Sequence, residues 1–120
     1  MPPHASSTQT IIFLIGNDDR LVYLLQRYME QSKCTMITMA SVPTHAEVDG
    51  PHPAAVIFSS VEQLQDAQPL VESLSAHKIP VLVCASQADE VLARELGADA
   101  CLLYPLTYDL FQAALSSVYP

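Results

Sequence analysis

Apolar residues follow two alternating patterns along the chain, one typical of strands and the other of helices. Short unbroken apolar runs, rich in β-branched residues, predict buried strands. These runs occupy residues 11–15, 54–58, 80–84 and 101–103, and residues 34–39, which include two threonines, are predicted to form a further strand. Between them, apolar residues spaced three or four apart predict helices. The helical segments are residues 19–31, 61–77, 89–96 and 108–118.

The ends of the predicted helices carry residues that start or stop a helix. Asp18 and Asp19 suit the start of the first helix, because acidic side chains cap free backbone N–H groups and complement the helix dipole. Pro69 lies inside the second helical segment and should kink it or restart it. Gly97 suits a left-handed cap after the third segment. Residues 41–53 contain three prolines, so they hold at most one or two helical turns, around residues 44–48.

Strands that alternate with helices predict a single α/β domain. Because the strands are apolar without a break, both faces of the sheet should be buried, which indicates a parallel, doubly wound sheet with helices on both faces. Residues 11–119 form this domain, after a polar, flexible tail at residues 1–10 that lacks the pattern of a signal peptide. The last helix should face inward through four residues: Leu110, Phe111, Ala114 and Leu115.

The carboxyl ends of the strands are the expected place for a functional crevice, as in other doubly wound sheets. The loops at these ends begin at Gly16, Ser59, Ala85 and Tyr104.

The charge of the chain excludes two classes of partner. Thirteen acidic residues and five basic ones give a net charge of −8, and no basic cluster offsets it. Nucleic acids and anionic membranes are therefore not expected partners, whereas a protein with a basic patch is favoured. No apolar run approaches the ~20 residues that span a bilayer. We expect a cytoplasmic protein.

The cysteines and histidines show no pattern typical of a metal or redox site. Cys34, Cys84 and Cys101 match no such motif, and each lies in an apolar stretch, so we expect buried, reduced thiols. The four histidines are scattered along the chain. The sequence therefore predicts no metal site and no cofactor.

Four segments are similar to those of a known family. IIFLIGNDDRLVYLL resembles an opening strand, acidic pair and first helix, and PHPAAVIFSS resembles the strand that ends on a phosphate acceptor. IPVLVCAS and GADACLLYPL resemble the fourth strand and the segment that leads to a Lys-Pro pair. Over residues 11–118 the chain thus resembles the CheY-like receiver domain of bacterial response regulators. The resemblance implies strand order 2-1-3-4-5, a second helix that is short or missing, and a place in two-component or phosphorelay signal transduction.

The resemblance also places the acidic pair and the phosphate acceptor of the family on altered residues. The pair falls on Asn17 and Asp18, the alignment that keeps Leu21 and Val22 in the apolar helix positions of the family, and the acceptor falls on Ser59. A shift by one residue would place the pair on Asp18 and Asp19. A receiver needs a carboxylate nucleophile and a Mg²⁺ ion that carboxylates hold. A serine hydroxyl forms no acylphosphate and is a weak nucleophile without a base. We expect weak or absent Mg²⁺ binding and no phosphorylation at Ser59.

The other positions of this degenerate phosphoacceptor pocket are changed as well. The hydroxyl position after the fourth strand falls on Ala85, with Ser86 next to it, and the switch position falls on Cys101. The Lys-Pro pair falls on Tyr104 and Pro105, so no lysine neutralises a phosphoryl group. The resemblance implies a cis peptide bond between Tyr104 and Pro105.

The Tyr104 ring is expected to fill the space of the missing ion and lysine. Its hydroxyl would then be directed at Asp18 or Ser59. The alternative is a ring that points to solvent.

Three enzyme hypotheses find little support in these loops. The acidic segment GNDDR would repel the phosphate of a mononucleotide. A serine hydrolase that uses Ser59 would need a histidine base in the other crevice loops and a Gly-x-Ser-x-Gly turn, and the sequence has neither there. A cysteine nucleophile at Cys84 would be buried in a strand and would resist ionisation. The sequence therefore predicts a protein that is not an enzyme.

Binding is the remaining use of a receiver fold. The resemblance implies that a partner or a second copy meets the face formed by residues 89–96, 101–103 and 108–119. Its outward residues are predicted to be Glu90, Arg94, Tyr108, Asp109, Gln112 and Ser116. A second candidate surface on the first helix carries Arg20, Tyr23 and Arg27. Ordinary solvated polar surfaces would explain both sets equally well.

The leading hypothesis is a bacterial pseudo-receiver that acts by phosphorylation-independent protein–protein contact. Its partner would be a signalling protein, a histidine kinase, an output domain or a second copy of the chain. Two alternatives stay open: a conventional Mg²⁺-dependent phosphoacceptor with a divergent site, and a small-ligand sensor that uses the altered crevice.

Overall fold

A computed structural model describes residues 10–39 and 53–118, and its elements follow the predicted order. The strands are β1 (Thr10–Ile15), β2 (Cys34–Met39), β3 (Ala55–Phe58), β4 (Val81–Ala85) and β5 (Ala100–Leu103). The helices are α1 (Asp19–Gln31), α3 (Val61–Asp66), α4 (Gln68–Ala76), the 3-10 turn η2 (Gln87–Asp89), α5 (Glu90–Glu95) and α6 (Tyr108–Val118). The helical turns predicted around residues 44–48 lie outside the described residues. None of the helices in the described ranges has the length and apolar character needed to cross a membrane.

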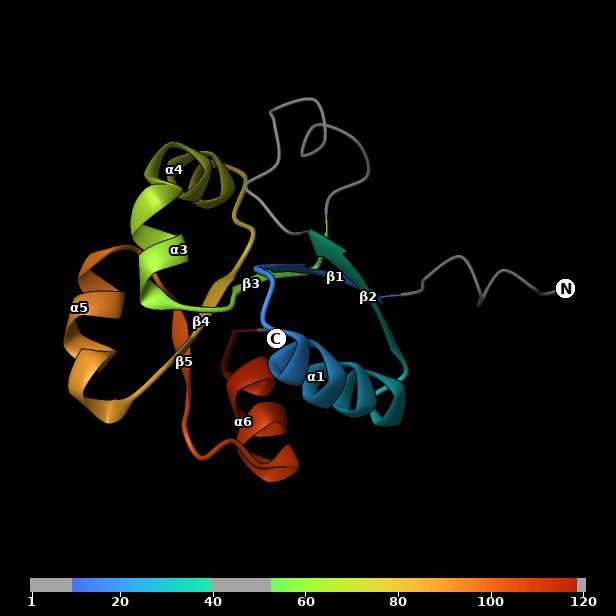
Figure 1. Cartoon of the computed structure of the whole chain (residues 1–120). Coiled ribbons are helices and arrows are strands. Elements are labelled where there is room, and N and C mark those ends of the chain that lie inside the picture. The colour runs from blue at the N-terminus through green and yellow to red at the C-terminus, as the bar shows by residue number, and fades with distance from the viewer. Residues whose placement is uncertain (1–9, 40–52, 119–120) are drawn as a thin grey trace, which may run out of the picture.

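The five strands form one parallel sheet in the order β2-β1-β3-β4-β5, which confirms the expected fold class (Figure 1). Helices α1 and α6 cover one face of the sheet, and α3, α4 and α5 cover the other. Because all strands run the same way, their carboxyl ends share one edge and their amino ends share the opposite edge.

Alternate strand residues fill two hydrophobic cores, one on each face of the sheet. In β1, Ile12 and Leu14 pack with α1 and α6, whereas Phe13 and Ile15 pack with α3, α4 and α5. All four side chains are buried. Burial of one such side chain contributes roughly 1.5–3 kcal/mol, so the two cores hold the helices on the sheet.

Pro69 divides the second helical segment, as its position in the sequence predicts. α3 ends at Asp66 and α4 begins at Gln68, with Pro69 in its first turn, where the missing N–H breaks no helical hydrogen bond. The Gln68 side chain donates to the carbonyls of Leu64 (3.0 Å) and Leu96 (2.9 Å). This one amide therefore joins the C-terminal ends of α3 and α5.

Gly97 follows α5 and has the predicted left-handed backbone, with a φ of 106°. A Cβ at this position would lie 2.7 Å from Cγ1 of Val71. A glycine is required both by the backbone conformation and by the close packing against α4.

Three predictions about burial are wrong. The whole sheet is expected to be buried, but no residue of the edge strand β2 is fully buried and Ile37 is 42% exposed. Leu110 is predicted to face inward, but its side chain is 49% exposed, because α6 turns Phe111 and Leu115 into the core. Cys34 and Cys101 are half-buried, and only Cys84 is a buried thiol as expected.

Alanine substitution in α6 should distinguish its buried residue from its exposed neighbour. Phe111 is 0% exposed, so Phe111→Ala should lower the free energy of unfolding by about 3–5 kcal/mol through lost burial and a cavity. Leu110→Ala is the matched control, with an expected loss of about 0.5 kcal/mol or less. Urea unfolding measures both values. Equal losses would contradict this packing.

Candidate functional site

The loops after β1, β3, β4 and β5 meet at the carboxyl edge of the sheet. The strand order reverses at β1, which lies between β2 and β3, and open α/β sheets bind ligands beside such a switch point. The predicted pocket residues follow these strands, so the topology brings them to one edge.

Ser59, at the acceptor position, packs its side chain against Gly16. A Cβ added to Gly16 would overlap Ser59 Oγ, so the hydroxyl occupies space that only a glycine leaves open. A backbone hydrogen bond from the Ser59 N–H to the Ile15 carbonyl (2.9 Å) also joins the ends of β3 and β1. The Gly16 N–H donates to the Met39 carbonyl (2.8 Å), which joins the loop after β1 to the end of β2. The end of β3 is therefore closed against the loop after β1.

Asp18 caps helix α1. Its carboxylate accepts hydrogen bonds from the backbone N–H groups of Arg20 (3.1 Å) and Leu21 (3.3 Å), while Asn17 and Asp19 are exposed. Such a cap stabilises a helix by about 1 kcal/mol. Within residues 10–39 and 53–118, no group of three His, Cys, Asp or Glu side chains is placed to hold a metal ion.

The Tyr104 hydroxyl lies near the Cys84 thiol, so that each group affects the pKa of the other. Burial raises the pKa of Cys84 to about 12 and the pKa of Tyr104 to about 12, and the charge of Asp18 contributes to both shifts. Both groups therefore stay protonated at neutral pH, so neither serves as a nucleophile. The Tyr104 ring is 46% exposed, and its hydroxyl contacts Cys84 instead of the predicted Asp18 or Ser59.

The remaining pocket positions lie beside this pair. Ala85 is buried at the end of β4, and the exposed Ser86 directs its hydroxyl to Asp89 Oδ2 (3.4 Å) in η2. The peptide bond between Tyr104 and Pro105 is cis, as predicted.

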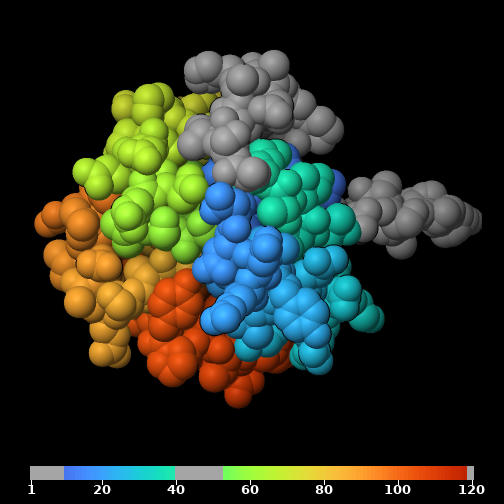
Figure 2. All heavy atoms as spheres, in the orientation of Figure 1, coloured from blue at the N-terminus to red at the C-terminus, as the bar shows by residue number. Residues whose placement is uncertain are grey.

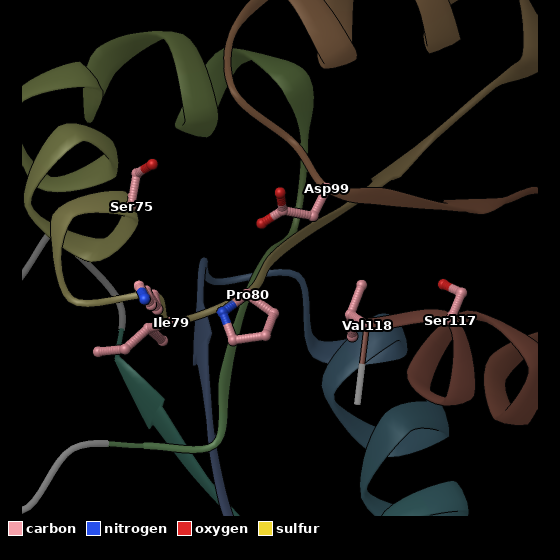
Figure 3. A pocket seen from close by; sticks show the side chains of 7 residues that line it. Ser75, Ile79, Pro80, Asp99, Ser117 and Val118 are labelled. Atoms are coloured by element: carbon pink, nitrogen blue, oxygen red, sulfur yellow. The ribbon is translucent and has the colours of Figure 1, made fainter. Parts of the chain in front are cut away.

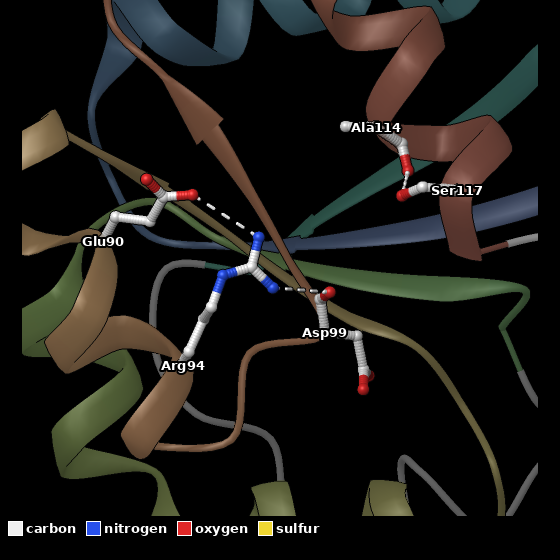
Figure 4. A network of polar contacts seen from close by, with 5 residues as sticks. All are labelled: Glu90, Arg94, Asp99, Ala114 and Ser117. Carbon is white, nitrogen blue, oxygen red and sulfur yellow. Dashed lines mark hydrogen bonds and ion pairs between the residues drawn. The ribbon is translucent and has the colours of Figure 1, made fainter.

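Cys101, at the switch position, borders a groove of about 250 Å³ between α5, β5 and α6. Burial raises the pKa of the Cys101 thiol, and the charge of Arg94 opposes that shift. Arg94 itself forms an ion pair with Glu90 (3.4 Å) and donates to the Asp99 carbonyl (3.3 Å), as Figure 4 shows. Arg94 is thereby held at the rim of the groove.

Tyr108 and Gln112, predicted to lie on the interaction face, are placed on the side of α6 that contacts α1. The ring of Tyr108 lies 5.6 Å from that of Tyr28, and Gln112 donates to Ser32 Oγ (2.8 Å) and to the Tyr108 hydroxyl. Atoms of α1 (blue) and α6 (red) meet in Figure 2. Tyr108 and Gln112 are four residues apart in α6, and Tyr28 and Ser32 are four residues apart at the end of α1. A single sequence does not indicate that these two pairs meet.

The apolar part of the predicted interaction face was not anticipated from the sequence. Val91 is 70% exposed, Leu92 is 43% exposed and Leu110 is 49% exposed, and Asp109 and Ser116 are exposed beside them. The adjacent apolar residues Val91 and Leu92 could have indicated this exposed surface. A short helix that buries Ala93 exposes the two residues before it. We call this surface the α5–β5–α6 face: Glu90, Val91, Leu92, Arg94, Leu103, Asp109 and Leu110.

The second candidate surface lies on the outer side of α1. Tyr23 is 64% exposed, Arg27 donates to its hydroxyl (3.2 Å), and the Arg27 guanidinium lies 5.7 Å from the Tyr23 ring centre. The exposed Arg20 lies one turn before this pair on the helix. The structure therefore brings the three residues of this surface together on one helix face.

Comparison with known proteins identifies the fold. No family model and no curated protein matches the sequence. Solved structures do match, among them full-length FixJ from B. japonicum, at 19% identity and a TM-score of 0.72 over 92% of this chain. The chain has the receiver fold of CheY-like response regulators. It spans 58% of full-length FixJ.

Two further solved structures cover the receiver-like domain more evenly. A putative response regulator from Chloroflexus aurantiacus has 15% identity and a TM-score of 0.76, over 92% of this chain and 98% of that one. The chemotaxis response regulator CheY4 of Vibrio cholerae has 14% identity and a TM-score of 0.72, over 93% of this chain and 100% of that one. At such identities the similarity concerns the fold.

The stability of the receiver-like domain should fall as the pH rises from about 9 to about 12. Cys84 and Tyr104 have ordinary pKa values of 9.0 and 10.0, and in the folded protein both rise to about 12. The folded state therefore binds these protons more tightly than the unfolded state. The resulting contribution to the free energy of unfolding is fully present below pH 9 and is lost as the pH rises to the folded-state pKa values.

Urea unfolding at a series of pH values tests this. Cys84→Ser removes the thiol that titrates, so the free energy of unfolding of this variant should fall less steeply with pH. Cys34→Ser, at a less buried thiol, should change the slope less. A slope that Cys84→Ser leaves unchanged would contradict the raised pKa of Cys84.

Proposed function

We propose that this receiver-like domain acts in signal transduction through protein–protein contact and without phosphorylation. One observation carries the proposal: at the end of β3 the acceptor position holds Ser59, whose hydroxyl packs against Gly16. The residue at this position has no carboxylate to form an acylphosphate, and among the described residues no side chain is hydrogen-bonded to the Ser59 hydroxyl to activate it.

The state of the neighbouring residues supports the proposal. Asp18 is the one carboxylate at the three aligned metal positions, and its oxygen is engaged as the cap of α1. Mg²⁺ requires several oxygen ligands in octahedral geometry, and a single carboxylate that is already bonded provides a poor site. Tyr104, at the lysine position, is a neutral phenol near Cys84 and supplies no positive charge to a phosphoryl group.

The α5–β5–α6 face is the surface that we propose for the partner. Leu110 lines the groove above Cys101, and the exposed Val91 and Leu92 lie on α5, the helix that carries the Glu90–Arg94 ion pair. Apolar residues surrounded by a charged rim are typical of contact surfaces. The partner would be a signalling protein, a histidine kinase, an output domain or a second copy, and the net charge of −8 favours one with a basic patch.

Titration with Mg²⁺ and beryllofluoride, a phosphoryl mimic, tests the loss of phosphorylation. Backbone amide NMR shifts of Asn17, Asp18, Ser59 and Tyr104 should not change, because the site lacks the charges that hold the ion and the mimic. Saturable shifts that spread from these residues to the α5–β5–α6 face would overturn the proposal and restore a phosphorylation switch.

A variant that restores the lost groups provides the positive control for this titration. Asn17→Asp, Ser59→Asp and Tyr104→Lys together supply the carboxylates and the lysine at the aligned positions. This triple variant should show saturable shifts with Mg²⁺ and beryllofluoride. That result would attribute the absence of shift changes in the natural protein to these three residues.

Sedimentation velocity tests whether the partner is a second copy. In that case the average mass should rise with protein concentration, and Leu110→Glu should abolish the rise by placing a charge in the apolar contact. Gln65→Glu adds the same charge to an exposed position of α3, outside this face, and should have little effect. A monomer at every concentration would exclude the second copy and leave a different protein as the partner.

A further inference from the structure

Strand β2 lies at one end of the sheet, and its outer side carries backbone groups that no described strand pairs. Within the described part of the chain, β1 is the only strand that pairs with β2 (Figure 1). The Met39 carbonyl accepts the Gly16 N–H from the loop after β1, so the backbone groups of Met39 point towards β1. Because successive residues of a strand direct these groups to opposite sides, the N–H and C=O groups of Met36 and Thr38 point outward.

The side chains of β2 do not protect this open side. The strand has the sequence CTMITM, without a charged residue, proline or glycine. Ile37 is 42% exposed, and Thr38 is exposed next to it. Proteins usually protect an edge strand with charges, prolines, bulges or a very short length, because an open edge strand pairs with other strands. β2 has six residues in a continuous register with β1 and shows none of these features.

The other end of the sheet is protected. β5 has four residues, and the charged Arg94 lines the same groove as Ala100, Cys101 and Leu103 of that strand. The Arg94 guanidinium donates to the carbonyl of Asp99 (3.3 Å), the residue before β5, which borders a pocket of about 390 Å³ at the amino edge (Figure 3). A short strand beside a charged side chain resists pairing. β2 is therefore the end at which another strand can extend the sheet.

The features of β2 match an antiparallel pair of two β2 strands with a two-fold axis at Ile37. In this register Ile37 lies opposite its own copy, at a non-hydrogen-bonded position where side chains are closest. Met36 lies opposite Thr38 of the second copy, and these two residues exchange backbone hydrogen bonds. The pairing thus satisfies the outward backbone groups and buries the most exposed apolar side chain of the strand.

The charge of the molecule also favours β2 as the place where two copies meet. Each copy has a net charge of −8, so two copies repel each other over most of their surface. Like charges directly opposite each other destabilise paired strands, but β2 has no charged side chain to place there. A two-fold pair is also closed, because each copy covers the open strand of the other.

We infer that β2 pairs with β2 of a second copy, in antiparallel orientation, so that the two sheets become one. The inference goes beyond the proposed function and does not depend on it. β2 and the α5–β5–α6 face lie at opposite ends of the sheet, so the dimer leaves that face free on both copies. A partner with two matching sites is then bound more tightly by the dimer than by one copy.

Sedimentation velocity of the whole protein tests this dimer. The contact is small, so we expect a Kd of about 100 μM and an average mass that rises with concentration towards that of a dimer. Ile37→Lys should abolish the rise, because it places two positive charges opposite each other on the axis. Val91→Lys is the matched control: Val91 is also an exposed apolar residue (70%) but lies on α5, and its substitution should leave the rise unchanged.

Thr38→Pro tests the backbone pairing separately from the side chains. Proline removes the outward N–H of Thr38, and edge strands tolerate proline where the N–H faces away from the sheet. The variant should stay folded, with a urea midpoint close to that of the natural protein, and should remain a monomer at every concentration. Dimerisation with an unchanged Kd would contradict pairing through the backbone of β2.

Amide hydrogen exchange locates the contact within β2. The N–H groups of Met36 and Thr38 should exchange rapidly in dilute protein and gain protection in concentrated protein. The Ile37 N–H, which points towards β1, should be protected at both concentrations.

Three outcomes of these experiments would overturn the inference. The first is an average mass that does not rise with concentration. The second is a rise that Val91→Lys abolishes and Ile37→Lys does not, which would place the contact on the α5–β5–α6 face. The third is equal protection of the Met36 and Thr38 amides at both concentrations, which would show that the outer side of β2 is covered within one copy.

Discussion

Burial of the central strands of the parallel sheet on both faces is the constraint on which the rest of this molecule depends. All four residues of β3 are buried, as are all five of β4, and among the described residues no buried side chain is polar or charged. A polar group in the dry centre of the sheet would cost free energy without a partner. Polar chemistry is therefore confined to the two edges. The carboxyl edge carries the altered crevice, and the amino edge carries the pocket beside Asp99.

Much of this architecture could be predicted from local signals in the sequence. The bounds of α1 follow from the Asp18 cap and the helical spacing, and the break before α4 follows from Pro69. The exposure of Leu110 could not be predicted, because periodicity defines a broad apolar stripe on the helix. It does not indicate which residue at the margin of that stripe packs against another element. The tertiary contacts of α6 decide that Phe111 is buried and that Leu110 is exposed.

The candidate site could be predicted in position but not in its contacts. Ser59 was expected at the carboxyl edge because it follows an apolar strand, and the topology confirms that location. The proximity of Tyr104 to Cys84 was not foreseen, because it depends on how two strands align. Ala85 lies opposite Leu103, and the Tyr104 N–H donates to the Ala85 carbonyl (3.1 Å), which brings Tyr104 beside the end of β4. One sequence alone gives no register between strands.

The altered crevice also differs from a phosphoacceptor in its electrostatics. Two carboxylates about 4 Å apart repel by about 4 kcal/mol at an effective dielectric constant of 20, so a cluster of three depends on a bound cation. Here Asn17 and Ser59 are neutral, Cys84 and Tyr104 stay protonated, and Asp18 is satisfied by backbone N–H groups. On the proposed function, this crevice is stable without a bound ion.

The same neutrality bears on how such a module could regulate a partner. A ligand or modification shifts a conformational equilibrium only by the difference in its free energy of interaction with the two states. A crevice that neither gains nor loses charge offers no such difference to the α5–β5–α6 face. On the proposed function, the affinity of that face for its partner is then set by its permanent shape. Control would lie in how much of each protein is present, and in whatever else competes for Val91, Leu92 and Leu110.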